Sequence, residues 1–420
     1  MTEVVERAAA SDIDAKRLRS DFPIFRRHIH GHRLVYLDSA ATSQKPETVL
    51  AAIDRYYRES NANVHRGVYL LAEDATELFE SARSSVARFI GAPESAEVIF
   101  TRNASEAINL VAYAWGRHNI SGGDVIVTTP LEHHSNFVPW QILASQVGAD
   151  LALVELHPDG TLDLDSLDAL LARGRVKLVT VAWVSNVLGT INPVQVIARR
   201  AHDAGALVLF DAAQAAPHLP LDVSATEADF VAITGHKMLG PMGIGVLWAR
   251  RKLLEEMPPF LAGGEMIRRV TEQGSTWNEL PWKFEAGTPN VEGAIGLQAA
   301  VEYLEALGMD AIRAHERRLV GLALERLQQI DGLRLLGPED ADLRGGVVAF
   351  DMASVHPHDL ASILDRTGVC IRAGHHCAQP LHDRLGIAAS ARASFYVYND
   401  EDDVDVLVEG IETAKRVMGA

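Results

Sequence analysis

Ala206-Leu-Val-Leu-Phe-Asp-Ala-Ala-Gln214 and Phe230-Val-Ala-Ile-Thr-Gly-His-Lys237 are the stretches that say most about the architecture of this chain. Each begins as an uninterrupted apolar run and ends in polar residues. Continuous apolar character, rather than strict alternation, is typical of strands buried on both faces, as in a mainly parallel sheet. We therefore expect Asp211 and Lys237 at the carboxyl ends of two neighbouring strands, where open α/β sheets bind ligands.

Similar apolar runs recur through the first 250 residues. We expect further strands at 97–101, 124–129, 151–154 and 176–181, with helices at 105–115 and 194–204. This alternation predicts an α/β layered fold with a mainly parallel mixed sheet. Beyond residue 295 the pattern changes to helices at 295–307 and 311–329, strands at 346–350 and 369–372, and a closing helix at 402–418. That part predicts a smaller α+β domain.

At roughly 150 residues per domain, a chain of 420 residues suggests two or three parts. We expect residues 1–30 to form an N-terminal helical segment, with a helix at 12–20, that joins the small domain. Residues 31–295 would form the large domain, and residues 296–420 the small domain.

Charge and cysteine content narrow the class of protein. The 39 Lys and Arg residues against 56 Asp and Glu give a net charge of −17, which disfavours nucleic acid and anionic membranes as partners. No apolar run approaches the roughly 18 residues of a membrane span, and the N-terminus lacks the apolar core of a secretory signal. The only two cysteines, Cys370 and Cys377, exclude a disulfide scaffold. We expect a soluble protein of the cytoplasm.

The pairing of Asp211 with Lys237 matches the needs of pyridoxal 5′-phosphate. That cofactor requires a lysine for a Schiff base and an acid beside its ring nitrogen. Gln214 could lie beside the ring oxygen. Taken singly, Asp211 could equally cap a helix, and Lys237 could be a solvated loop residue.

A phosphate site is expected where the run at 97–101 leads into a helix starting near Ser105, because free N–H groups gather there. Thr234 and His236 would add donors, although a serine at a helix start is also a common structural cap. In Glu132-His-His134, adjacent histidines point in different directions. They fit ring stacking better than a metal site, and we expect no metal site in this chain.

The segment Arg372-Ala-Gly-His-His-Cys377 places a thiol in a polar loop, where a thiolate can be stabilised. The alternative for Cys377 is a buried small apolar residue, which we expect for Cys370. Arg392 could bind a substrate carboxylate through two N–H groups, or lie on the surface.

In combination, the motifs resemble the pyridoxal-phosphate-dependent cysteine desulfurases of the aminotransferase class V group, specifically the Suf-type (group II) enzymes. The resemblance runs from about Tyr36 to the C-terminus. The matching motifs are Tyr36-Leu-Asp-Ser-Ala-Ala41, Asn63-Val-His-Arg-Gly67, Glu132-His-His134, Ser185-Asn-Val-Leu-Gly189, Asp211-Ala-Ala-Gln214, Thr234-Gly-His-Lys237, Phe284-Glu-Ala-Gly-Thr-Pro-Asn290 and Arg372-Ala-Gly-His-His-Cys377.

The resemblance implies a fold-type I homodimer with composite active sites. It implies that the cofactor is bound by Lys237, Asp211, Gln214, His133, Ser105, Thr234 and His236, with Thr288 reaching across from the other subunit. It implies that the substrate is bound by Asn186, Arg372, Arg392 and His65. Ala104 departs from the family, which often has two threonines before this helix, so one hydroxyl donor to the phosphate is lost.

The implied reaction converts L-cysteine to L-alanine and leaves a persulfide on Cys377, with Lys237 and His133 as the other catalytic residues. The sulfur would supply Fe–S cluster assembly through the Suf machinery, by way of an acceptor that is either scaffold-like and zinc-dependent or SufE-like. His358, in a polar turn entering a helix, could exchange as a zinc ligand with such an acceptor, or simply belong to the helix start.

Four alternatives remain open from sequence. A selenocysteine lyase or cysteine-sulfinate desulfinase would share the same cofactor residues, and an aminotransferase would not require Cys377. A catalytically silent scaffold that binds a sulfur carrier would not require Lys237 or Asp211. A histidine-rich zinc hydrolase is the fourth.

Overall fold

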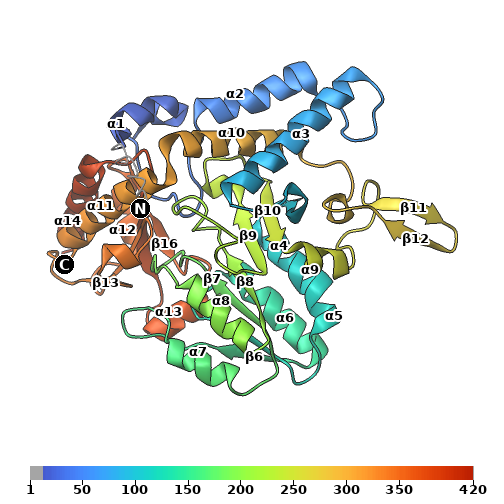
Figure 1. Ribbon diagram of the computed structural model, residues 1–420. Coiled ribbons are helices and arrows are strands. Elements are labelled where there is room, and N and C mark those ends of the chain that lie inside the picture. The colour runs from blue at the N-terminus through green and yellow to red at the C-terminus, as the bar shows by residue number, and fades with distance from the viewer. Residues whose placement is uncertain (1–12, 420) are drawn as a thin grey trace, which may run out of the picture.

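The computed structural model describes residues 13–419, and a seven-stranded sheet forms its centre (Figure 1). The strands are, in spatial order, β4 (Val98–Thr101), β10 (Gly245–Ala249), β9 (Phe230–Thr234), β8 (Leu207–Asp211), β7 (Val176–Ala182), β5 (Val125–Thr128) and β6 (Asp150–Leu153). From β9 to β6 all neighbours pair in parallel, whereas β10 is antiparallel to both β4 and β9. The six predicted strands are confirmed to within about two residues, and β10 is the strand that the sequence analysis missed.

Side chains of this sheet alternate between two apolar layers. In β8, Val208 and Phe210 belong to one cluster and Leu209 to the other. The first layer includes apolar residues of α3 (Leu70–Phe89), α7 (Leu164–Leu171), α8 (Val194–Asp203) and α10 (Val291–Leu307). The second includes those of α4 (Ala104–Leu110), the π-helical turn that follows it (Val111–Gly116) and α6 (Val138–Val147). Burial on both faces explains why the strands are apolar throughout.

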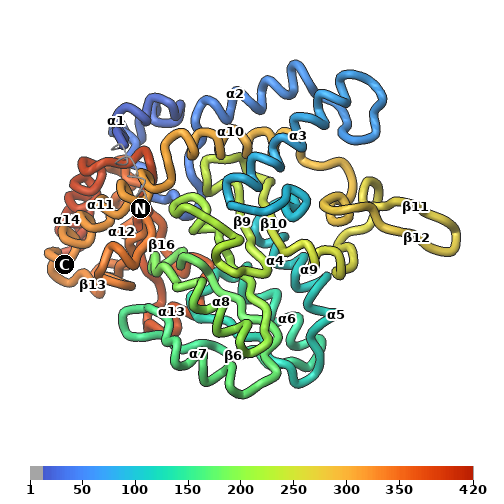
Figure 2. Tube along the Cα trace, viewed as in Figure 1, coloured from blue at the N-terminus to red at the C-terminus, as the bar shows by residue number. Residues whose placement is uncertain are grey.

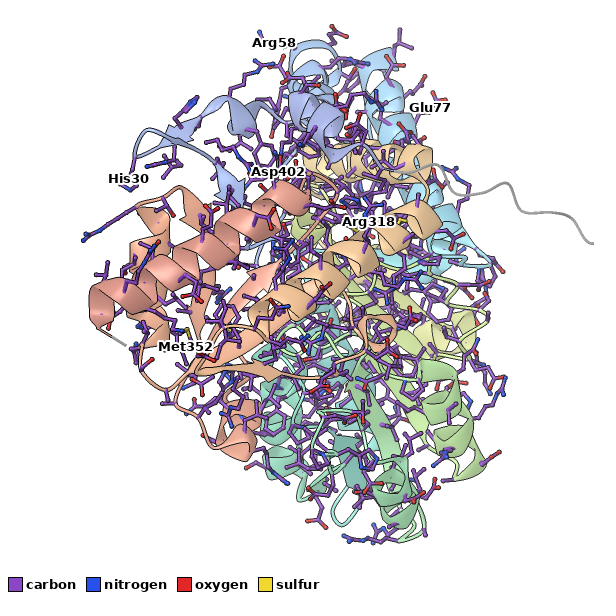
Figure 3. All side chains as sticks on the ribbon, turned by 90° about the vertical axis from the view of Figure 1, so that its left-hand side faces the viewer. His30, Arg58, Glu77, Arg318, Met352 and Asp402 are labelled. Carbon is purple, nitrogen blue, oxygen red and sulfur yellow. The ribbon has the colours of Figure 1, made fainter. Side chains whose placement is uncertain are left out.

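The C-terminal part is built on an antiparallel sheet of four strands. In order they are β13 (Leu333–Leu336), β14 (Val347–Met352), β17 (Ser390–Ser394) and β16 (Arg372–Gly374). Three helices pack with it: α11 (Met309–Leu327), α12 (Pro357–Asp365) and α14 (Glu401–Met418). Figure 3 shows α11 and α14 side by side, with Arg318 on one and Asp402 on the other. The predicted helices of this part and the strand predicted at 346–350 are confirmed with shifted ends. The single strand predicted at 369–372 is wrong, because the chain forms two short strands there, β15 (Val369–Cys370) and β16, which pair in different sheets.

The helices and strands do not test the predicted domain limits at 30/31 and 295/296. The limit at 295/296 falls inside α10, which begins earlier than expected because Asn290 caps it, its Oδ1 accepting from Gly293 N at 2.9 Å. The predicted helix at 12–20 starts at a residue outside the described part of the chain. Within that part it is shorter, with α1 (Ala15–Leu18) followed by a 3-10 turn. Arg19 joins α1 to the C-terminal part by bonding Tyr398 O at 2.8 Å.

One hairpin projects from the body of the molecule, formed by β11 (Ile267–Thr271) and β12 (Gly274–Trp277) (Figure 2). The remaining helices and strands are α2 (Glu47–Arg55), α5 (Arg117–Asn119), α9 (Arg251–Glu256), α13 (Gln379–Leu385), β1 (His28–Ile29), β2 (His32–Arg33), and the parallel pair β3 (Val35–Tyr36) and β15 (Val369–Cys370). Across residues 13–419, no helix combines the length and the apolar character that crossing a bilayer requires.

Candidate active site

A cavity of about 200 Å³ lies at the carboxyl ends of the central strands and is closed on one side by the small sheet. It is lined by Ala40, Ala41, Asn103, Ala104, Ser105, His133, Ser135, Asn186, Asp211, Ala213, Thr234, His236, Lys237, Arg372, His376 and Arg392. Most of the predicted site residues therefore share one cavity, although they come from segments far apart in sequence. The residues that follow strands of the large sheet converge because these strands end at one edge of the sheet, whereas Arg372 and Arg392 come from the small sheet.

Asp211 and Lys237 provide the opposite charges of the cavity. Asp211 is the last residue of β8 and is buried, with Oδ1 accepting from Ala213 N at 2.9 Å. Burial raises the pKa of its carboxyl, and the Lys237 ammonium opposes this. Lys237 lies in the 3-10 turn after β9. Burial lowers the pKa of its amine to about 8, against the effect of Asp211. A lysine with such a pKa is more readily neutral than a solvated one.

His133 has a defined tautomer. Its Nδ1 accepts from the backbone N of Ser135 at 3.1 Å, and an N–H can only donate, so the proton of the neutral ring is on Nε2. Burial, followed by the charge of Lys237, lowers its pKa to about 3, which keeps the ring neutral. The Ser135 hydroxyl lies 2.9 Å from the same Nδ1 and 2.5 Å from Oγ of Ser105.

The start of α4 differs slightly from the prediction. Asn103, rather than Ser105, is the cap, and its Oδ1 accepts from Glu106 N at 2.9 Å. Ser105 is the second residue of the helix, so its hydroxyl does not cap the helix, and the residue lines the cavity. Thr234 Oγ1 is buried without a hydrogen-bond partner in residues 13–419. These hydroxyls and the helix start form an arrangement suited to a phosphate.

The backbone carbonyl of His236, which precedes Lys237, accepts hydrogen bonds from several donors. Four groups lie within hydrogen-bond distance of the carbonyl oxygen of His236: the Thr42 hydroxyl at 3.0 Å, the Ser43 N–H at 3.0 Å and hydroxyl at 3.1 Å, and the Lys45 ammonium at 2.9 Å. Burial lowers the pKa of Lys45 to about 7. Residues 42–45 therefore fix the turn from which the Lys237 side chain extends.

Two arginines face each other across neighbouring strands. Arg372 of β16 is directly opposite Arg392 of β17, and like charges in that position repel. Arg392 Nη1 donates to Asn186 O and Nη2 to Asp38 Oδ1, both at 2.9 Å, whereas its buried Nε has no partner among the residues described. An anion between the two guanidinium groups would relieve the repulsion, which indicates a site for a carboxylate.

Cys377 lies beside this cavity in a half-buried loop with left-handed backbone, φ 57°. Arg372 Nη2 is 3.9 Å from its sulfur, so a positive charge lies beside the thiol. His134 N donates to the Cys377 carbonyl at 2.7 Å, so the loop is anchored to the large sheet. Cys370 is also half-buried, but it belongs to β15, and burial raises the pKa of its thiol.

Several predicted residues do not line the cavity. Gln214 lies behind Ala40, with its Nε2 donating to Ala40 O at 2.7 Å. Cys377 lies just outside. His65 is 2.9 Å from Glu80 and stacks edge-on against Trp282, so a single chain does not bring it to the substrate.

Thr288 lines a second cavity, of about 530 Å³, with Phe260, Leu261 and Phe284 among its walls. Both cavities border the start of α4, because Asn103 lines the first and Arg102 the second. His358 is exposed at the start of α12. Its imidazole lies near Gly374 of β16, since a Cβ built on that glycine would be 3.9 Å from His358 Nε2.

The sequence analysis missed some residues of the site. Asp38, Lys45, Ser135 and His376 were given no role, although Asp38 and His376 stand inside quoted motifs. Ser135 had a local signal, because it lies only two residues after His133, whose Nδ1 it contacts. Asp38 and Lys45 had none, since their partners are about 190 to 350 residues away in sequence.

The residues present fit pyridoxal phosphate. Buried donors without partners, at Thr234 Oγ1 and Arg392 Nε, suit a phosphate and a carboxylate. The cavity also holds the lysine and the acid that the cofactor needs, and His133 offers a neutral ring at its wall.

Comparison with known proteins agrees with this geometry. The model of the aminotransferase class-V family matches residues 35–407, so the chain belongs to that family. Within it, the chain is 53% identical over 412 residues to a probable cysteine desulfurase of Streptomyces coelicolor, covering 97% of this chain and 98% of the relative. It is 48% identical over 427 residues to a cysteine desulfurase of Haloferax volcanii, covering 99% of each.

Solved structures give the same result. The apo cysteine desulfurase of Thermococcus onnurineus superposes with a TM-score of 0.92 at 41% identity, covering 98% of this chain and all of that one. The cysteine desulfurase CsdA of Escherichia coli, in its S-sulfonic acid form, gives 0.89 at 38% identity, covering 97% of this chain and all of that one. The predicted fold-type I architecture is confirmed, and pyridoxal phosphate is the cofactor of this family's cysteine desulfurases.

Proposed function

We propose that this protein is a cysteine desulfurase, which converts L-cysteine to L-alanine and keeps the sulfur as a persulfide on Cys377. The observation that carries the proposal is the position of the Cys377 thiol, held by Arg372 beside the cavity that contains Lys237 and Asp211. The relatives named above carry the same activity in their names.

When bound, pyridoxal phosphate withdraws electrons from the substrate, which acidifies the α-proton and weakens the bond from the β-carbon to sulfur. Lys237 would hold the cofactor and, once released by the substrate, accept the α-proton at Nζ. Its lowered pKa suits a base at neutral pH. Asp211 would face the ring nitrogen, Gln214 the ring oxygen, and Ser105, Thr234 and His236 the phosphate. His133 would stack on the ring and present its Nε2–H as a proton donor.

The substrate would be oriented by its carboxylate. Arg392 is fixed by Asn186 and Asp38, so its free Nε–H is already positioned to donate. Arg372 adds a second positive charge and holds the Cys377 thiolate. The thiolate attacks the substrate sulfur, so that an S–S bond forms and the C–S bond breaks. The electron pair of the broken C–S bond stays with the β-carbon, which takes a proton to become the methyl group of alanine, and the α-carbon takes back the proton held by Lys237.

The active enzyme is proposed to be a homodimer of the Suf type in the cytoplasm, where its free thiols stay reduced. The position of Thr288 supports the dimer, because it lines a cavity that borders the start of α4 from outside the active site. A second copy of the chain would have to bring Thr288 to the phosphate.

Sulfur acceptance is proposed to require a partner protein of the Fe–S assembly machinery, either zinc-dependent and scaffold-like or SufE-like. The cysteine loop is anchored by His134, so the acceptor must come to the cavity. His358 lies near that loop and is exposed, which suits exchange of a zinc ligand with the first kind of acceptor. His358→Ala should lose only the rate stimulated by such an acceptor and keep the rate with a small-molecule reductant. Equal stimulation of both proteins would exclude this role.

The test of the proposed function is to supply L-cysteine with and without a reductant and to measure alanine and sulfide together. The wild type should release both in equal amounts when the reductant is present. Lys237→Ala should lose the visible absorbance of the lysine-bound cofactor and all alanine release. Turnover of cysteine by this variant at the wild-type rate would refute the assignment.

A further inference from the structure

His376 precedes the nucleophile, and its tautomer is fixed by a carbonyl group. Its Nε2 is 3.1 Å from the backbone O of Ser390 and 3.1 Å from the Ser390 hydroxyl. A carbonyl oxygen can only accept, so Nε2 carries a proton. The side chain is 3% exposed, and burial and the charge of Arg392 lower its pKa to about 2. The ring is therefore neutral, and Nδ1 is a lone-pair acceptor.

A second histidine supports this assignment. His382 Nδ1 is 3.0 Å from the carbonyl of Ala378 and must donate to it. Burial lowers the pKa of this ring, which favours the neutral form, and in that form Nε2 is unprotonated. That Nε2 is 2.9 Å from the Ser390 hydroxyl, which therefore donates to His382. The lone pairs of the hydroxyl are then available to the Nε2–H of His376. The hydrogen bonds therefore run in one direction, from His376 Nε2–H to the Ser390 hydroxyl and from that hydroxyl to His382 Nε2.

The Nδ1 atom of His376 is left without a partner inside the protein. It is buried, and no described residue lies within hydrogen-bond distance, although the side chain lines the active-site cavity. The ring is held in place, because its Nε2 is bound to Ser390 and its backbone is fixed by Asn186 Nδ2, which donates to the His376 carbonyl at 2.7 Å. Leaving a buried acceptor without a donor is unfavourable, so this atom indicates a ligand that donates to it.

We propose that His376 is a substrate-positioning residue whose Nδ1 accepts a hydrogen bond from the thiol of the substrate cysteine. This proposal rests on the proposed function. The substrate carboxylate is an acceptor and suits Arg372 and Arg392, and its amino group is directed to the cofactor held by Lys237. The thiol, protonated at neutral pH with a pKa of about 8.5, is the remaining donor. A bond from the thiol to Nδ1 would hold the substrate sulfur in the cavity that His376 lines together with Arg372, whose Nη2 is 3.9 Å from the Cys377 sulfur.

The same geometry predicts a preference between substrates. A selenol is more acidic than a thiol and is ionised at neutral pH, so selenocysteine has no proton to donate to Nδ1. Cysteine sulfinate is likewise an anion at that position. His376 therefore favours the thiol substrate, and its removal should affect cysteine selectively.

Two variants of the holoenzyme separate the acceptor from the structural bond. In His376→Asn, the side-chain oxygen can take the place of Nδ1 and keep an acceptor in the cavity. In His376→Gln, the longer amide can keep a donor to the Ser390 carbonyl but leaves no acceptor at the Nδ1 position. We expect His376→Gln to lower kcat/KM for cysteine about tenfold, the worth of one good hydrogen bond, and to leave kcat/KM for selenocysteine unchanged. His376→Asn should recover most of the loss.

A binding measurement on the wild type does not depend on how the variants fold. The change in cofactor absorbance should report binding of S-methylcysteine, which has no S–H, about tenfold weaker than that of cysteine. His376→Gln should reduce this difference. Equal losses on cysteine and selenocysteine, or equal binding of cysteine and S-methylcysteine by the wild type, would overturn the role of His376. Failure of the wild type to release alanine would instead refute the proposed function, so the two failures are distinguishable.

Discussion

At the scale of single residues, the two cysteines show how environment separates chemically identical side chains. Cys370 belongs to a strand, and burial raises the pKa of its thiol. Cys377 is in a left-handed loop with an arginine 3.9 Å from its sulfur. A thiolate is the nucleophile in sulfur transfer, so only Cys377 has the surroundings that the reaction needs.

Cys377→Ser should keep the cofactor and still bind cysteine, yet fail to transfer its sulfur. The reason is that the serine hydroxyl is a poor nucleophile toward sulfur and cannot form a persulfide. Mass spectrometry of the wild type after one turnover, without reductant, should find the extra sulfur on Cys377. Turnover of selenocysteine should survive in part, because its C–Se bond is weaker. A persulfide found on Cys370 instead would contradict the assignment.

At the scale of elements, β16 and β17 set the charge of the site through their register. The antiparallel pairing puts Arg372 opposite Arg392, and shifting either strand by one residue would turn one arginine away. The repulsion between the two guanidinium groups favours an anionic ligand at this site.

Arg372→Gln should raise the free energy of unfolding of the substrate-free holoenzyme by about 0.2–1 kcal/mol, because a directly opposed like-charge pair is removed. The same variant should lower kcat/KM for cysteine at least tenfold, since the carboxylate loses a cation and the thiolate loses its partner. Denaturant unfolding and steady-state kinetics measure the two effects. Lower stability with unchanged kinetics would show that Arg372 has only a structural role.

At the scale of the whole molecule, the proposed roles of Thr288 and His65 require a second copy of the chain. Thr288 lines a separate cavity, and His65 is held by Glu80. A homodimer with composite sites accounts for Thr288, and mixed dimers can test it.

A homodimer of Lys237→Ala chains should be inactive, and a homodimer of Thr288→Ala chains should bind the cofactor weakly. A mixed dimer of one chain of each kind should contain one intact site. If Thr288 acts across the interface, both defects fall in one site of the mixed dimer, and the other site is wild type. Co-expression with two different tags isolates the mixed dimer, and cofactor occupancy at limiting cofactor is the readout. If Thr288 instead acts within its own chain, each site keeps one defect and occupancy stays low.

The local pattern of the sequence was sufficient for the strands that carry Asp211 and Lys237, because strands buried on both faces read as apolar runs with polar ends. It was less reliable where local signals compete. Asn103 took the cap expected at Ser105, and α10 began before its predicted start because of a cap at Asn290.

What the sequence by itself determined was therefore the set of elements, the order of the motifs and the chemical types at the ends of the strands. Only the tertiary structure decided which of these side chains meet. Three examples depend on contacts between different segments: the hydrogen bond from Lys45 to the His236 carbonyl, the pairing of Arg372 opposite Arg392, and the bond from His376 to the Ser390 carbonyl. The reason is physical: periodicity and capping depend on neighbours along the chain, whereas a hydrogen bond between distant segments depends on packing, which no local pattern encodes.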